Sequence, residues 1–151
     1  MPDTLYDALR ESHEVQRSLC RKLLRSKPGE GRQELFTALR IELAAHEAAE
    51  ERYLYVPMLM NDAGLDSSRH ALHEHHELDE LVEDLRERAP GDRGWMNTMR
   101  KLSKKVHHHL KEEETKFFQV SGRLIGAGDK LKLGKQYRRD YQRMVNKLQA
   151  Q

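Results

Sequence analysis

The sequence predicts an all-α protein, an antiparallel up-down four-helix bundle with a short amphipathic helix at its C-terminal end. Three segments rich in Gly, Pro and Asp, residues 26–31, 61–68 and 89–94, mark turns. The segments between these turns are dominated by Leu, Glu, Arg, Lys and Ala, which favour helices. We therefore expect helices over about 3–25, 32–60, 67–88 and 95–125. Long helices joined by short turns pack as antiparallel bundles.

The 151 residues fit a single folding unit, a bundle over 1–125 with a basic tail over 126–151. Residues 123–151 contain eight Lys or Arg and two Asp, whereas the rest of the chain has 19 basic and 23 acidic residues. The tail has an apolar edge at helical spacing, formed by Tyr137, Tyr141, Met144 and Leu148. We expect this edge to pack on the bundle, in preference to a contact with nucleic acid or acidic lipid.

Composition and motifs exclude several classes of protein. No apolar run approaches the roughly 20 residues that cross a bilayer, so we expect no membrane contact. The first residues, MPDTLYDALRESHE, lack the basic flank and apolar core of a secretion signal. A single cysteine, Cys20, excludes an intrachain disulfide and an iron–sulfur cluster and fits a reducing cytoplasm. Hydrolase, nucleotide-binding and NAD-binding motifs are missing.

The apolar face of each predicted bundle helix is interrupted by a histidine, and two faces also contain a glutamate one turn later. The four faces are Tyr6, Leu9, His13, Gln16, Cys20 and Leu23; Phe36, Leu39, Leu43, His46, Glu50 and Tyr53; Ala71, His75, Leu78, Val82 and Leu85; and Met99, Leu102, Val106, His109, Glu113, Phe117 and Val120. Burying six ionisable groups costs several kcal/mol unless they are paired or bind a metal. In an up-down bundle the four histidines lie at similar depths, so the six residues can form one metal site.

Neighbouring histidines compete for two of these positions. Within residues 73–76, His75 shares a helix face with Leu78, and within residues 107–109 only His109 has a glutamate four residues later, Glu113. We expect the other histidines of both clusters, and His70, to be solvated. Taken alone, His13 would be interpreted as a hydrogen-bonded histidine on a helix face, and the other five residues favour a ligand instead.

An internal repeat also predicts a dinuclear site. HEAAEERYLY at 46–55 matches HLKEEETKFF at 109–118, and both copies read H-x-x-x-E-E followed by aromatic residues. Two helical hairpins related by a pseudo-twofold axis would each supply imidazoles and one bridging carboxylate. We expect the aromatic residues of both copies to act as core packing that shields the metals.

This constellation resembles the hemerythrin family, specifically bacterial HHE cation-binding domains, over roughly residues 5–125. The motifs that carry the resemblance are ESHEVQRSL, LAAHEAAEERYLYVP, HEHHELDEL and HHHLKEEETKFF. The resemblance implies two non-heme irons bridged by Glu50 and Glu113 and by an oxo, hydroxo or water ligand. Imidazole and carboxylate ligands suit iron or manganese.

The sequence departs from the oxygen-carrying hemerythrins at two positions. Those proteins have a second histidine one turn after the third-helix histidine, where this chain has Asp79, and an aspartate five residues after the fourth-helix histidine. Here the glutamate Glu113 follows His109 by four residues. Asp79 is a possible weak ligand, and Glu47 a possible extra one. Fewer histidines would leave an open coordination position, which favours reaction with peroxide or nitric oxide over oxygen carriage.

These arguments predict a cytoplasmic di-iron protein that binds O2, NO or peroxide for sensing, storage or stress defence. One alternative is a peroxide-consuming oxidoreductase. Another is an iron-responsive regulatory module in which the basic tail reports metal occupancy to an unidentified protein partner. A zinc- or manganese-loaded bundle without redox chemistry is the third alternative.

Overall fold

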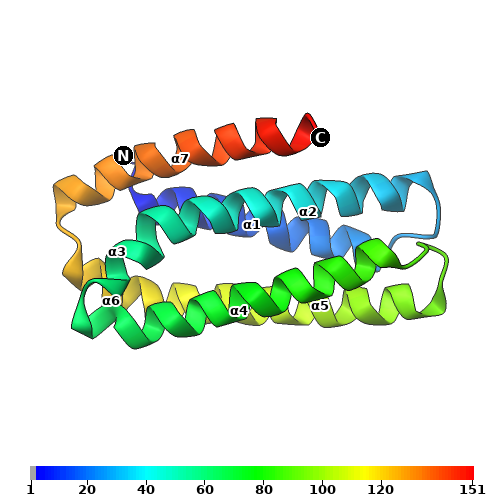
Figure 1. Cartoon of the computed structure of the whole chain (residues 1–151), viewed down its shortest axis with the longest axis horizontal. Helices are drawn as coiled ribbons and strands as arrows, with labels where there is room; N and C mark the ends of the chain where they lie inside the picture. The colour runs from blue at the N-terminus through cyan, green and yellow to red at the C-terminus, as the bar shows by residue number, and fades with distance from the viewer. Residues whose placement is uncertain (1–2) are drawn as a thin grey trace.

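Long helices lying side by side make up the computed structural model, which describes residues 3–151 (Figure 1). The elements are α1 (Leu5–Leu24), α2 (Glu30–Glu50), the π-helical turn η1 (Glu51–Tyr55), α3 (Val56–Leu59), α4 (Asp62–Glu87), α5 (Arg93–Glu112), the π-helical turn η2 (Glu113–Phe117), α6 (Phe118–Leu124) and α7 (Ala127–Gln149). Strands are absent from the described residues, so the all-α prediction is confirmed. Residues 1 and 2 of the predicted bundle unit lie outside the described part.

The chain reverses its direction between successive long helices (Figure 1). Helix α1 packs against α2, and α4 packs against α5. The two pairs meet where α1 contacts α5, and the short helix α3 also contacts α4. Helix α7 lies along α1 and α2, on the side away from α4 and α5 (Figure 1). The C-terminal helix therefore covers one of the two helix pairs.

Helix α4 begins earlier than the sequence suggests. Residues 61–68 were expected to form a turn, but α4 begins at Asp62. The side chain of Asn61 caps the helix by accepting a hydrogen bond of 2.9 Å from the backbone N–H of Ala63. Gly64 lies so close to the preceding helix that a Cβ atom would meet the Met58 carbonyl oxygen at 2.8 Å. The glycine in this segment therefore serves close packing and does not mark a turn.

The second and fourth predicted helices each contain a π-helical turn at the paired glutamates of the repeat, which begins at Glu51 in the first copy and at Glu113 in the second. The backbone N–H of Val56 donates to the carbonyl of Glu51, and that of Phe118 donates to the carbonyl of Glu113. Each turn adds one residue to the helix and rotates the following face by about 100°. As a result Tyr55 is fully buried, whereas Tyr53, expected on the buried face, is only half-buried.

Two apolar clusters form the core, and the histidine and glutamate layer lies between them along the helices. The first cluster comprises Leu5, Ala8, Leu9, Ala49, Leu54, Tyr55, Met58, Ala71, Phe117, Phe118, Ile125 and Tyr137. The second comprises Cys20, Leu23, Leu39, Leu43, Leu78, Val82, Leu85, Trp95, Met99, Leu102, Val106 and Leu110. Burial of these side chains stabilises the helices and holds the polar layer away from water.

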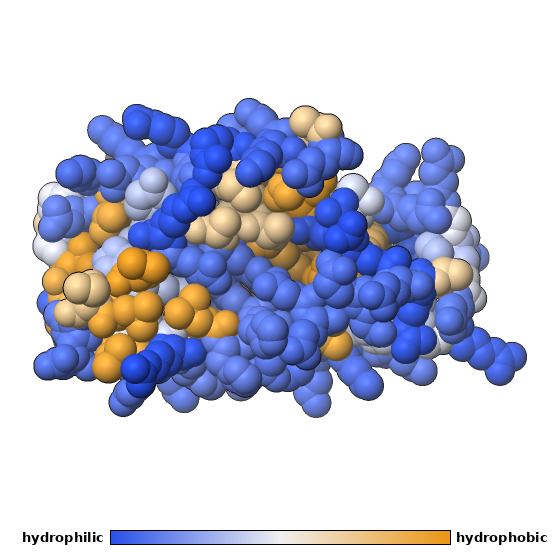
Figure 2. Space-filling model, in the orientation of Figure 1, coloured by the Kyte–Doolittle hydropathy of each residue, from blue (hydrophilic) through white to orange (hydrophobic). Residues whose placement is uncertain are grey.

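Polar side chains cover most of the molecular face drawn in Figure 2. Apolar residues gather on this face toward the end of the molecule where α3 lies, and Val56 and Met60 are 52% and 86% exposed at and beside that helix. Within residues 3–151, every helix is too short or too polar to cross a bilayer.

Candidate metal centre

The structure brings all six predicted site residues together in the middle of the molecule. They are His13 on α1, His46 and Glu50 on α2, His75 on α4, His109 at the end of α5 and Glu113 at the start of η2. Each is at most 3% exposed. Asp79 is exposed on α4, and Glu47 is buried on α2, but neither belongs to a group of clustered metal-binding side chains.

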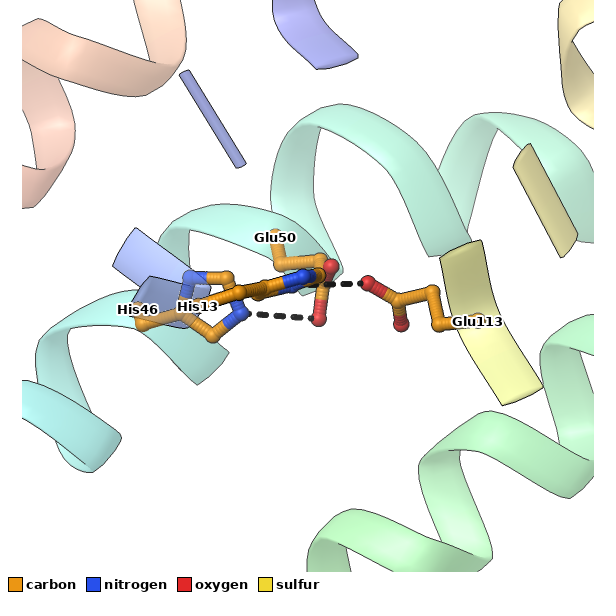
Figure 3. Close-up of side chains that lie close together, drawn as sticks. All are labelled: His13, His46, Glu50 and Glu113. Carbon is orange, nitrogen blue, oxygen red and sulfur yellow. Dashed lines mark ion pairs between the residues drawn. The ribbon is translucent and has the colours of Figure 1, made fainter. Parts of the chain in front are cut away.

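The six residues form two groups of four that share two members. One group is His13, His46, Glu50 and Glu113, whose side chains point toward one another in Figure 3. The other group is Glu50, His75, His109 and Glu113. Within each group the potential ligand atoms all lie within 4.8 Å of one another. The geometry thus offers two adjacent positions that share both glutamates.

The centre has two halves, one with His13 and His46 and the other with His75 and His109. Each glutamate faces one histidine from each half. Oε1 of Glu50 lies 3.3 Å from Nε2 of His46 and 3.2 Å from Nε2 of His75. Each oxygen of Glu113 faces a different histidine. Oε1 lies 3.3 Å from Nε2 of His13, and Oε2 lies 3.5 Å from Nε2 of His109. Both carboxylates therefore lie between the two halves, as bridging ligands would.

Several buried polar atoms of the centre have no aligned hydrogen-bond partner among residues 3–151. They are Nε2 of His13, His46 and His109, Oε2 of Glu50 and Oε1 of Glu113. A buried polar group without a partner costs about 1–3 kcal/mol. Since these atoms converge on shared positions, two cations would satisfy them together. Imidazole nitrogens and carboxylate oxygens form a ligand set that suits iron, manganese or zinc.

The other ring nitrogen of each histidine, Nδ1, is held by a partner outside the two groups. The partners are Glu114 for His13 at 2.7 Å, Tyr137 for His46 at 2.6 Å, Glu51 for His75 at 3.2 Å and Glu74 for His109 at 2.9 Å. Such contacts fix the ring orientation and direct Nε2 toward the metal position. Sequence reasoning missed all four partners.

The internal repeat explains two of these contacts. Glu51 and Glu114 are the second glutamates of the two H-x-x-x-E-E copies. Each accepts a hydrogen bond from the histidine of a different helix, since Glu51 binds His75 on α4 and Glu114 binds His13 on α1. Arg17 also donates to Glu114, at 2.7 Å. The second glutamate of each motif copy was thus the sequence signal for a residue that binds Nδ1 of a histidine of the centre.

The two halves of the centre differ at the remaining contacts. Glu74, which precedes His75, reaches His109 directly. The residue that precedes His13 is Ser12, whose shorter side chain contacts the hydroxyl of Tyr137 at 2.7 Å. That hydroxyl in turn contacts His46. Helix α7 therefore contributes a side chain to the centre, although its sequence indicated only an apolar packing edge.

Tyr55 and Phe118 occupy equivalent repeat positions but differ in chemistry. The Tyr55 hydroxyl donates to Oε1 of Glu50 at 2.7 Å, contacts Oε2 of Glu113 and lies 3.3 Å from Nε2 of His75. Phe118 instead stacks on the ring of His13, with ring centroids 5.8 Å apart and planes 19° apart. Tyr55 is thus more than the packing residue expected from the sequence, because its hydroxyl connects both shared glutamates.

The two shared glutamates influence each other's ionisation. Burial opposes ionisation of Glu50, but the charge of His46 and nearby hydrogen bonds outweigh it and lower the pKa of Glu50. Burial and the charge of Glu50 raise the pKa of Glu113. Burial, followed by the charges of both glutamates, raises the pKa of Tyr55, so its hydroxyl keeps its proton. The two carboxyl groups thus shift in opposite directions, because ionisation of Glu50 opposes that of Glu113.

Comparison with known proteins finds a matching family, a similar solved structure and a protein of similar sequence. The model of the family described as hemerythrin HHE cation binding domain matches residues 4–120. The crystal structure of a hemerythrin HHE cation binding domain-containing protein from Mycobacterium kansasii has the same fold, with a TM-score of 0.85, 24% identity, and coverage of 95% of this chain and 88% of that one. A DNA nickase from Nostoc sp. is 27% identical over 114 residues, which are 76% of this chain but 32% of the nickase. The chain thus spans about a third of that relative, and α7 lies beyond the family match.

Proposed function

Because the chain belongs to the hemerythrin HHE cation binding domain family, we propose that it is a non-heme di-iron protein that binds O2, NO or peroxide. The observation that carries this proposal is the sharing of Glu50 and Glu113 by two groups of buried histidines. In this proposal His13 and His46 bind one iron, His75 and His109 bind the other, and both glutamates bridge. Manganese at one or both positions fits the same ligand set.

The proposal includes a finer description of the fold. Helices α1, α2, α4 and α5 form a hemerythrin-like up-down bundle, and α7 is a fifth helix that belongs to the same unit. The contact between Tyr137 and His46 supports this assignment, because α7 then helps to orient a ligand. We place the protein in the cytoplasm, where the buried thiol of Cys20 stays reduced.

The protein side chains prepare the site for a small ligand. Bound iron supplies redox chemistry and coordination positions for a diatomic molecule or peroxide. A pocket of about 80 Å³ reaches His109 and Glu113 and is lined in part by Ala71 and Phe117. This volume admits a few small molecules only. The outer partners of the histidines hold Nε2 in place.

Peroxide consumption is the second candidate function, and Tyr55 is the observation that favours it. Reduction of peroxide requires a proton near the ligand, and the Tyr55 hydroxyl keeps its proton at Oη beside both glutamates. We do not extend the DNA nickase activity of the Nostoc protein to this chain, since the shared segment is about a third of that protein.

Anaerobic loading with ferrous iron tests the proposal. We expect about two irons per chain by metal analysis and a new near-ultraviolet absorption band when oxygen is added. The variant in which both Glu50→Gln and Glu113→Gln are introduced should bind neither iron tightly, while circular dichroism shows intact helices. Repeated turnover of added peroxide would favour the enzyme over a carrier or sensor. A folded wild-type protein that takes up no iron would refute the proposal.

A further inference from the structure

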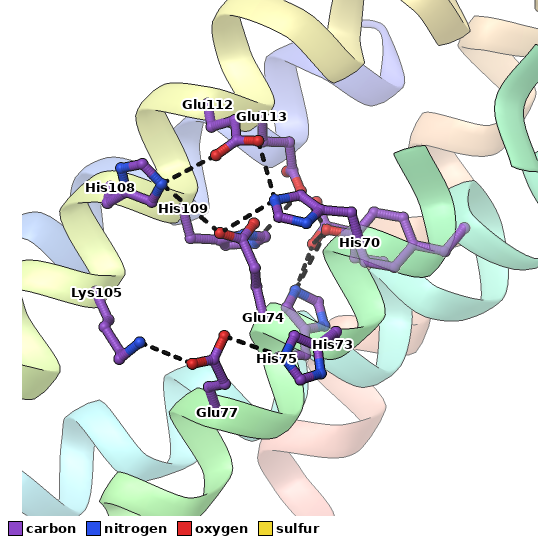
Figure 4. Close-up of polar contacts among 12 residues, drawn as sticks. His70, His73, Glu74, His75, Glu77, Lys105, His108, His109, Glu112 and Glu113 are labelled. Carbon is purple, nitrogen blue, oxygen red and sulfur yellow. Dashed lines mark hydrogen bonds and ion pairs between the residues drawn. The ribbon is translucent and has the colours of Figure 1, made fainter. Parts of the chain in front are cut away.

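A second group of histidine and glutamate side chains lies outside the buried centre, on the exposed side of α4 and α5 (Figure 4). It consists of His70 and Glu74 on α4 and Glu112 at the end of α5, with potential ligand atoms all within 4.8 Å of one another. Nε2 of His70 is 3.0 Å from Oε1 of Glu112 and 3.6 Å from Oε2 of Glu74. His108 lies beside them, 3.0 Å from Oε2 of Glu112.

This group differs from the other exposed histidines of α4. His73 faces Glu77, and His76 faces Glu80, as ordinary pairs one helical turn apart. Among the described residues, the group around His70 is the only one outside the buried centre that brings three such ligands together. Its members come from two helices, so it is a product of the tertiary structure and not of helical periodicity.

The group lies at the mouth of the pocket that reaches the buried centre. Among the residues that line this pocket, His70 is exposed and Glu74 and Glu112 are half-buried, whereas His109 and Glu113 are buried. Glu74 contacts both the exposed group and the buried centre. Its Oε2 faces His70, and its Oε1 accepts the hydrogen bond from Nδ1 of His109 at 2.9 Å. One carboxylate thus connects the exposed group with a histidine of the centre.

Charge at the mouth favours a cation. Glu74 places one carboxylate at the mouth, with Oε2 facing His70. Glu112 adds a second carboxylate, and Lys116 on the same pocket wall adds an opposing positive charge. A solvent-accessible site with two carboxylates, one imidazole and a nearby lysine binds cations more weakly than a buried centre with more ligands.

We propose that His70, Glu74 and Glu112 form a third divalent-cation site, which receives cations at the pocket mouth before they reach the buried pair. The loading role rests on the proposed di-iron function, because it requires the buried centre as the destination. A cation needs such a route since every residue of the centre is at most 3% exposed. His108 pairs with Glu112 but is not one of the three clustered side chains.

Stopped-flow loading of metal-free protein with Co²⁺ tests the route, because bound cobalt is followed by its visible absorption. The test variant carries His70→Ala and Glu112→Gln, and the matched control carries His76→Ala and Glu80→Gln, which remove an exposed pair away from the pocket. We expect the test variant to fill the buried centre several-fold more slowly, but to reach the same final occupancy of the two buried positions. The control should load as fast as the wild type. Equal rates in the test variant and the control would overturn the route.

Binding of Mn²⁺ at equilibrium, counted by electron paramagnetic resonance, tests the site separately from the route. We expect three bound ions in the wild type and the control but two in the test variant. The variant with both Glu50→Gln and Glu113→Gln should still bind one Mn²⁺ ion weakly. This ion should be lost when His70→Ala and Glu112→Gln are added. If the buried centre took up no metal, the proposed function would fail, while this residual ion would still support the third site. An unchanged count in the test variant would refute the site.

Discussion

The hydroxyl of Tyr137 lies 2.6 Å from Nδ1 of His46, although 91 residues separate the two in the chain. The same hydroxyl contacts Ser12, so three helices meet at this oxygen atom. The other three histidines of the centre use carboxylates for the same purpose. His46 is therefore the one ligand candidate that a neutral group orients, and this group comes from outside the segment matched by the family model.

Replacing Tyr137→Phe should weaken metal binding in the half of the centre formed by His13 and His46. Loss of such an outer contact costs roughly 10–100-fold in metal affinity, and the ring packing of Tyr137 is kept. Within the buried centre, titration of metal-free protein with Co²⁺ should show one weakened site and one unchanged site. Tyr53→Phe is the control, since Tyr53 is half-buried on the same chain segment as the centre but is not one of its outer partners. Equal weakening by both changes would contradict the assignment.

Removal of single histidines tests the ligand set. His46→Ala and His109→Ala should each lower the metal content by about one ion per chain, because each change removes one nitrogen and frees the facing glutamate. His107→Ala should keep both ions, as His107 contacts the Ser103 carbonyl on its own helix. Metal analysis after dialysis measures the result. If all three variants lost the same amount of metal, the histidine assignment would be wrong.

Chelation should lower the melting temperature of the loaded protein by several degrees or more. A metal that binds only the folded chain stabilises it by roughly 4 kcal/mol when its free concentration is a thousandfold above Kd. Without metal, the coupled carboxyl groups of Glu50 and Glu113 and the unpaired imidazoles stay buried. The double variant with Glu50→Gln and Glu113→Gln should lose the part of this shift that the buried centre causes. A wild type that is insensitive to chelator would argue against a metal in the core.

Substitution of Gly134→Ala should destabilise the docking of α7. A Cβ atom at this position would lie 2.8 Å from the backbone carbon of Thr4 and 2.9 Å from the backbone nitrogen of Leu5. Such overpacking typically costs 1–3 kcal/mol, and the shift of α7 should also weaken metal binding through Tyr137. Gly128→Ala, where nothing lies within 4 Å of the added atom, should cause no loss of stability. Denaturant titration measures both, and equal effects would show that α7 does not dock tightly.

The family and much of the site were predictable because they depend on local periodicity. Apolar residues at helical spacing define the helix faces, and a histidine or glutamate on such a face must enter the core with it. This rule selected His75 from its neighbours His73 and His76, and the structure buries His75 while the other two are exposed. The match to the family model over residues 4–120 confirms the resemblance stated from the motifs.

The sequence by itself determined the helical character of the chain and the six side chains that converge in its core. Only the tertiary structure decided where the helix faces rotate and which residues hold the histidines. In the π-helical turn η1, which contains Tyr55, backbone hydrogen bonds span five residues where an α-helix has four, and composition does not encode this change. The contact of Tyr137 with His46 depends on how α7 packs across α1 and α2, because a hydrogen bond between distant residues forms only when packing fixes both partners.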